Sequence, residues 1–101
     1  MTEELIKFNE SGFTHLQYRF PAASIREKVE RDFEKTEKFI FDFDGVESIS
    51  NSFADECFAK LLLKFEMDKI KEKTTFQNTN RFIKSVIANA FKDRISAMVN
   101  E

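Results

Sequence analysis

The sequence predicts a small α/β domain, a mixed β-sheet with helices packed on it, in the approximate order ββαβαβα. Three patterns predict this: strand-like alternation near the N-terminus, a continuous apolar run at residues 39–43, and segments whose apolar residues recur every three or four positions. Two glycines and one proline provide no linker composition. We therefore expect residues 1–101 to form a single domain.

A β-hairpin and a helix are expected first. Residues 5–8 and 13–20 have strand-like sequences separated by a turn-like segment. Pro21 ends the second strand, and Ser24 and Glu27 have the spacing of a capping box, which predicts a helix start at Ser24. The apolar residues of this helix that would face the core are Ile25, Val29 and Phe33.

The middle of the chain predicts a central strand followed by a helix. Residues 39–43 are apolar except for Asp42, as expected of a strand buried at its aromatic positions. Ser52 and Asp55 again have capping-box spacing, so the helix should begin near Ser52. Its predicted apolar face consists of Phe53, Ala54, Cys57, Phe58, Leu61, Leu62 and Phe65.

The last predicted elements are a short strand at 74–76 and a C-terminal helix, for which Asn78 and Asn80 are candidate caps. The segment 69–73, "KIKEK", is expected to be a solvated helix end because Glu72 interrupts its basic residues. The residues predicted on the buried side of the last helix are Phe82, Ile83, Val86, Ile87, Ala90, Phe91, Ile95 and Met98.

Composition argues against several classes of protein. The formal charge of -2 creates no field that would attract nucleic acid or an anionic membrane. The single cysteine, the absence of a long apolar run and the absence of a signal-peptide pattern predict a cytoplasmic protein. Cys57 lies on an apolar helix face and His15 has no second histidine, so we expect no metal site, no Cys–His pair and no cofactor.

One short motif suggests an enzyme. The sequence "FIFDFDGV" resembles the first motif of haloacid-dehalogenase-type phosphohydrolases. That resemblance implies a nucleophilic role for Asp42, a general-acid role for Asp44 and a Mg²⁺ ion between them. The acids that follow, such as Asp68 and Asp93, are isolated and do not form the downstream pair that completes such a metal site. Phosphohydrolase activity is therefore the alternative hypothesis.

A second resemblance covers more of the chain. From residue 22 to about residue 63, the helix, the "FIFDFDGVESIS" strand and the "NSFADE" helix start resemble a bacterial STAS-like family of unknown function, related to STAS anti-sigma factor antagonists. The resemblance implies a non-enzymatic regulator that binds an ATP-binding, kinase-like anti-sigma factor. In those antagonists, phosphoserine at the start of this helix switches binding off.

The loop departs from the STAS phosphorylation pattern Asp-Ser/Thr-Ser/Thr-Gly. Superposition places Ser50 at the aspartate, Asn51 at the usual phosphoacceptor, Ser52 at the third position and Phe53 at the glycine. Ser52 and Ser50 remain candidate phosphoacceptors, since phosphate at a helix N-terminus meets free N–H groups.

Two further interpretations of this loop are open. Helix capping alone would account for two of its residues, and a small anion or nucleotide could bind at the helix N-terminus. We favour a combination of capping and protein binding, because loops on rigid scaffolds often carry function. The predicted partner-binding residues are Ser48, Ser50, Asn51, Ser52, Asp55 and Glu56.

Overall fold

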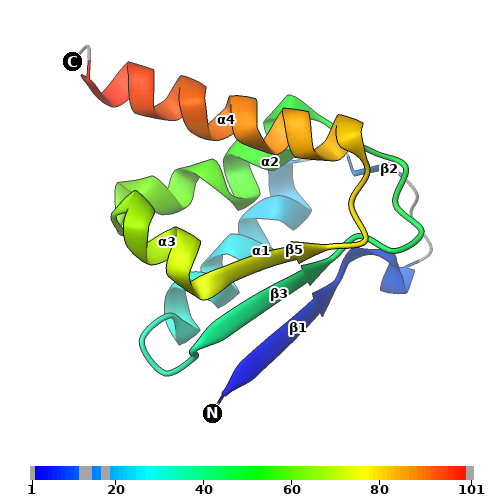
Figure 1. The fold of residues 1–101 in the computed structure, drawn as a ribbon, viewed down its shortest axis with the longest axis horizontal. Helices are drawn as coiled ribbons and strands as arrows, with labels where there is room; N and C mark the ends of the chain where they lie inside the picture. The colour runs from blue at the N-terminus through cyan, green and yellow to red at the C-terminus, as the bar shows by residue number, and fades with distance from the viewer. Residues whose placement is uncertain (1, 12–14, 17–18, 100–101) are drawn as a thin grey trace.

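The computed structural model describes residues 2–11, 15–16 and 19–99 and has the predicted α/β architecture. Its elements, shown in Figure 1, are β1 (Glu3–Lys7), the 3-10 helix η1 (Phe8–Ser11), β2 (His15–Leu16), α1 (Arg19–Asp32), β3 (Lys38–Asp42), β4 (Ser48–Ile49), α2 (Asn51–Cys57), the 3-10 helix η2 (Ala59–Leu63), α3 (Met67–Lys73), β5 (Thr74–Gln77) and α4 (Arg81–Val99).

The described strands form two parallel groups, so the predicted mixed sheet is wrong for this part of the chain. A three-stranded sheet has the order β1-β3-β5, and β2 pairs with β4 in a second, two-residue ladder. The connections explain the direction of the main sheet: α1 lies between β1 and β3, and helices again separate β3 from β5. Crossover connections of this kind return the chain parallel to the preceding strand.

The predicted N-terminal hairpin is also wrong. β1 pairs with β3, with Leu5 opposite Ile40, and the chain after β1 enters the 3-10 helix η1 where a hairpin turn was predicted. Residues 13–14 and 17–18 of the predicted second strand lie outside the described residues. Helix α1 begins at Arg19, five residues before the predicted start. Pro21 therefore lies in its first turn, where the missing N–H costs no helical hydrogen bond.

β3 is the central strand that the sequence predicts. Phe39 and Phe41 on this strand, and Phe43 just after it, are buried on the face covered by helices. The Phe41 ring packs edge-on against Phe58, with centroids 5.0 Å apart, and stacks on Phe76 at 5.4 Å. Helices lie on one side of the sheet (Figure 1). The aromatic side chains of one strand thus join the helical layer to the sheet.

The segment predicted as one helix from residue 53 to 65 is divided. α2 ends at Cys57, and after Phe58 the chain tightens into η2, with the Leu61 N–H donating to the Phe58 carbonyl. Residues 67–73 form α3, a separate helix anchored by buried Ile70, where we expected only a helix end. With β4 and α3 included, the order is ββαββααβα, which corrects the simpler order predicted.

Helix α4 confirms its predicted start but only part of its predicted core face. The Asn80 side-chain oxygen accepts a 2.8 Å hydrogen bond from the Ile83 N–H, as expected of a cap. Phe82, Ile95 and Met98 are 54%, 41% and 43% exposed, contrary to prediction. The C-terminal turns of α4 project beyond the rest of the fold in Figure 1, so no neighbouring element covers them. The residues buried as predicted are Ile83, Val86, Ile87, Ala90 and Phe91.

The part of the chain that the structure describes contains no helix with the length and apolarity required to cross a bilayer.

Truncation of the central aromatic residue should strongly destabilise the fold. We expect Phe41→Ala to lower the free energy of unfolding by about 3–5 kcal/mol, because it removes a fully buried ring and leaves a cavity. Phe82→Ala, which removes the same side chain from an exposed position, should cost about 0.5 kcal/mol or less. Urea denaturation would measure both. Equal losses would contradict the assignment of Phe41 to the core.

Candidate functional site

The loop that leads into α2 is fixed by a cap two residues earlier than predicted. Ser50 has an extended backbone, and its hydroxyl accepts a 3.0 Å hydrogen bond from the Phe53 N–H. The Ser50 N–H donates to the Leu16 carbonyl at 2.7 Å, which continues the β2–β4 pairing. Ser52 is already inside the helix, so the predicted Ser52–Asp55 capping box is wrong. The β-ladder decides the start of α2 because it holds Ser50 in the extended conformation that a cap requires.

The first turn of α2 presents polar groups outward and apolar groups inward. Asn51 is exposed and Ser52 is partly exposed, whereas Phe53 and Ala54 are buried. The Ser52 hydroxyl has no hydrogen-bond partner among residues 2–11, 15–16 and 19–99. Ser48, on β4, is also partly exposed. The structure thus brings Ser48, Asn51 and Ser52 to one short polar segment, which we call the α2 entry loop (residues 48–52).

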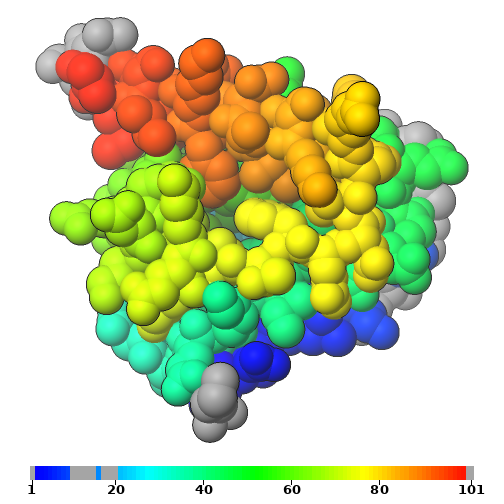
Figure 2. Space-filling view, viewed as in Figure 1, coloured from blue at the N-terminus to red at the C-terminus, as the bar shows by residue number. Residues whose placement is uncertain are grey.

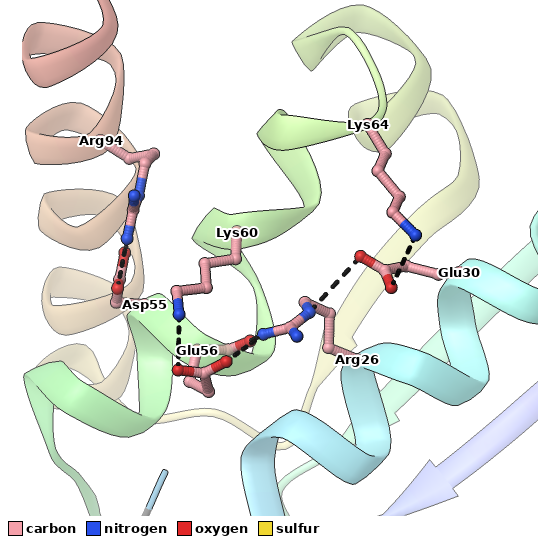
Figure 3. A network of polar contacts seen from close by, with 7 residues as sticks. All are labelled: Arg26, Glu30, Asp55, Glu56, Lys60, Lys64 and Arg94. Atoms are coloured by element: carbon pink, nitrogen blue, oxygen red, sulfur yellow. Dashed lines mark hydrogen bonds and ion pairs between the residues drawn. The ribbon is translucent and has the colours of Figure 1, made fainter.

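Asp55 connects α2 to α4. Its carboxylate accepts two hydrogen bonds from the Arg94 guanidinium, one from Nη2 at 2.6 Å and one from Nε at 3.1 Å (Figure 3). This two-pronged geometry restricts the orientation of both side chains. Asp55 is therefore engaged within the domain, although the sequence predicted it for partner binding.

Glu56 points inward and is only 7% exposed. One carboxylate oxygen pairs with the Arg26 guanidinium of α1, and the other accepts a 2.9 Å hydrogen bond from Lys60 Nζ (Figure 3). Arg26 also donates to the Glu56 backbone carbonyl at 2.8 Å. Burial alone would lower the pKa of Arg26, but the hydrogen bond and negative charge of Glu56 outweigh it and raise that pKa. Glu56 is thus a structural anchor.

These ion pairs add residues that the sequence analysis missed. Lys60 lies four positions after Glu56 on the same segment, a spacing that could have indicated the pair. Arg26 and Arg94 are 30 and 39 residues from their carboxylate partners, and no local pattern predicts such distant contacts.

A second polar region lies where the parallel strands end. One Asp42 carboxylate oxygen accepts hydrogen bonds from the Asn78 side-chain amide at 2.8 Å and from the Asp44 N–H at 2.9 Å. These two donors, Asn78 first, hold the pKa of Asp42 below its ordinary value. A hollow of about 200 Å³ adjoins them, lined by Lys7, Asn9, Asp42 and Asp44.

The turn beside Asp44 requires glycine. Gly45 has a φ of +80°, and a Cβ at this position would lie 2.3 Å from the side-chain nitrogen of Asn9. Side-chain groups therefore pack closely around the turn that carries the two predicted phosphohydrolase residues. No group of three or more His, Cys, Asp or Glu side chains that could hold a metal occurs in the described part of the chain.

Two single residues remain. Cys57 is fully buried, as predicted, and burial raises the pKa of its thiol, which disfavours the reactive thiolate. His15 lies on β2.

A model of the STAS-like domain of unknown function (DUF4325) matches residues 21–84, more than half of the chain, including the α2 entry loop and the whole segment from β3 to β5. The chain belongs to this family. No curated protein and no solved structure matches the sequence significantly. The predicted STAS-like resemblance is confirmed.

The dependence of stability on acid pH should test the hydrogen bonds to Asp42 in this STAS-like domain. Because the pKa of Asp42 is lower when folded than the unfolded value of about 3.9, its contribution to stability is present above that value and is lost as pH falls through the folded pKa. Asp42→Asn should therefore lose less stability than wild type between about pH 5 and pH 2.5.

Asn78→Gly provides the matched test, since it removes the amide donor and glycine tolerates the positive φ of 57° at this position. Its stability should also depend less steeply on pH than that of wild type. Urea denaturation across the pH range would measure the three proteins, and parallel curves would contradict the proposed role of Asp42.

Removing Arg26 should leave Glu56 poorly compensated. We expect Arg26→Met to reduce the free energy of unfolding by about 2–4 kcal/mol, because the buried Glu56 carboxylate would lose its ion pair with the guanidinium. The double variant Arg26→Met/Glu56→Met should be more stable than Arg26→Met, since it also removes the buried Glu56 carboxylate. Thermal and urea denaturation would measure the cycle. Additive losses would show that the two side chains do not interact.

Proposed function

We propose that this domain is a non-enzymatic regulator that binds another protein through the α2 entry loop and the exposed side of α2. The observation that carries this proposal is the contrast within one short segment. Asn51 and Ser52 face outward, while the residues around them hold α2 firmly against its neighbours. A polar surface on a rigid support loses little conformational freedom when it binds a partner.

The α2 entry loop lies within residues 21–84, the part of the chain that matches the STAS-like family. By the resemblance to STAS antagonists, we propose an ATP-binding, kinase-like anti-sigma protein as the partner and the cytoplasm as the site of action. The loop carries small hydrogen-bonding side chains and no lysine or arginine. It is therefore suited to a protein surface and offers nothing to attract a nucleic-acid backbone.

The geometry refines which loop residues would make the contact. Asp55 and Glu56 engage Arg94 and Arg26 within the domain, so we assign them the role of positioning α2. The proposed contact residues are Ser48, Asn51 and Ser52.

Ser52 is the more suitable of the two candidate phosphoacceptors. The Ser50 hydroxyl already caps α2, so a phosphate there would disturb the start of the helix. The Ser52 side chain is partly exposed on the first turn, one turn before Asp55. A phosphate on Ser52 would add negative charge at the proposed interface and weaken binding by desolvation and repulsion.

The phosphohydrolase alternative receives less support. The carboxylate oxygen of Asp42 that accepts from Asn78 and from the Asp44 N–H is held by two donors, which stabilises it and reduces its nucleophilicity. We therefore infer a structural role for Asp42 and no catalytic activity for the domain.

Substitutions at Ser52 should separate binding from folding. Ser52→Ala should change stability by about 0.5 kcal/mol or less, because Ser50 provides the cap, and should retain most binding. Ser52→Glu should weaken binding roughly a hundredfold, about 2.7 kcal/mol, because it places a charge inside the contact. The measurement is calorimetric titration with the partner recovered by pull-down from the native host.

Ser96→Glu is the matched control, since it makes the same chemical change at an exposed position on α4. It should bind like wild type. Thermal melts would confirm that each variant is folded. Equal affinities for wild type, Ser52→Ala and Ser52→Glu would place the interface elsewhere.

A further inference from the structure

A second surface, formed by residues other than the α2 entry loop, has different chemistry. A groove of about 390 Å³ lies between α4, β5 and the start of α3. In Figure 2 the face toward the viewer is hollowed where these three elements meet. The apolar side chains that line the groove are Met67, Phe76, Ile87, Ala88 and Phe91.

The apolar character continues along α4 beyond the groove. Ile95 and Met98 follow Phe91 by four and seven positions, which places them on the same side of the helix. They are 41% and 43% exposed. Together the groove and these two residues form an apolar strip that follows the length of α4.

Cations border this strip. Lys84 lines the groove, Lys71 follows Met67 by one helical turn, and Lys92 follows Ala88 by one turn. None of the three forms an ion pair within the described residues, whereas Arg26, Lys60 and Arg94 are all paired with carboxylates.

Few acids offset this positive charge. Asp93 is the single acid of α4 and lies half a turn away from Phe91 and Ile95, on the other side of the helix. Glu66 and Asp68 flank Met67 at one end of the groove. The lysines that lie on α4, away from these two acids in the sequence, are Lys84 and Lys92. The local positive charge beside α4 is opposite in sign to the formal charge of the whole protein, which is -2.

We propose that the groove binds an amphipathic helix of a partner protein, with apolar residues at i, i+3 or i+4 and i+7 and acidic residues beside them. The apolar side chains would fill the groove, and the acidic residues would meet Lys71, Lys84 and Lys92. A concave groove fits a cylindrical helix, whereas binding to a lipid surface requires an apolar face that can lie flat in the interface. The inference is independent of the function proposed for the α2 entry loop.

Selection from a displayed library of random 16-residue peptides would test the proposal. The full-length protein is the bait, and enriched peptides are synthesised and titrated by calorimetry against three proteins. We expect an enriched pattern of apolar residues at helical spacing with flanking Asp or Glu. Ala88→Glu should weaken binding at least tenfold, because it places a bulky negative charge in the groove. Asn89→Glu, one position away and outside the groove, should bind within about twofold of wild type.

Salt provides a second measurement. Raising the ionic strength from about 0.05 M to 0.5 M should weaken the selected peptides severalfold, since the proposed contacts are partly ionic. Failure to enrich any peptide, an enriched pattern without acids, or equal effects of Ala88→Glu and Asn89→Glu would overturn the proposal.

Two further measurements would detect a different occupant of the groove, either a second copy of this chain or a membrane surface. Sedimentation of the protein alone that shows a dimer, broken by Ala88→Glu, would assign the groove to a second copy and overturn the proposal. Cosedimentation with vesicles containing phosphatidylserine, lost in Ala88→Glu while no peptide is enriched, would assign the surface to a membrane and overturn it equally.

Discussion

Phe41 occupies the middle of β3, the strand that pairs with β1 on one side and β5 on the other. Its ring contacts Phe8 after β1, Phe58 after α2 and Phe76 on β5. One side chain on β3 therefore contacts residues from three other parts of the chain. The segments after β1 and α2 and the strand β5 each bring a phenylalanine ring against this residue, and the helices cover the face of the sheet on which Phe39, Phe41 and Phe43 are buried.

The second requirement is that α2 keep a fixed orientation on this core. Adjacent carboxylates achieve it by pointing to different neighbours: Asp55 to α4 and Glu56 to α1. Because Phe53 and Ala54 are buried in the same turn, the helix is held by apolar contacts beneath it and by ion pairs on two sides. The side chains left facing outward at the start of α2 are those of Asn51 and Ser52. The rigidity of α2 and the exposure of the loop thus have a common origin.

The two surfaces proposed for partners differ in their chemistry. The α2 entry loop presents small neutral hydrogen-bonding groups, so its affinity should respond sharply to one added charge. The groove beside α4 is apolar with a cationic border, so its affinity should depend on shape and ionic strength. Together, the two proposals describe a domain that joins two proteins, with phosphorylation of Ser52 controlling the contact at the α2 entry loop.

Local patterns in the sequence determined the elements whose stability is local. The aromatic run predicted β3, the three-four spacing predicted most of the buried face of α4, and Asn80 was among the predicted caps. The sequence motif of the α2 entry loop also indicated the family.

Tertiary structure decided the remaining features. β1 pairs with β3 because α1 returns the chain parallel to it, which no N-terminal pattern encodes. The cap of α2 is Ser50 and not Ser52 because β4 pairs with β2. The buried Glu56 carboxylate pairs with Arg26, which lies 30 residues away in the sequence. Ile95 and Met98 have the spacing of core residues, yet they are exposed because helical periodicity specifies a face and only neighbouring elements can cover it.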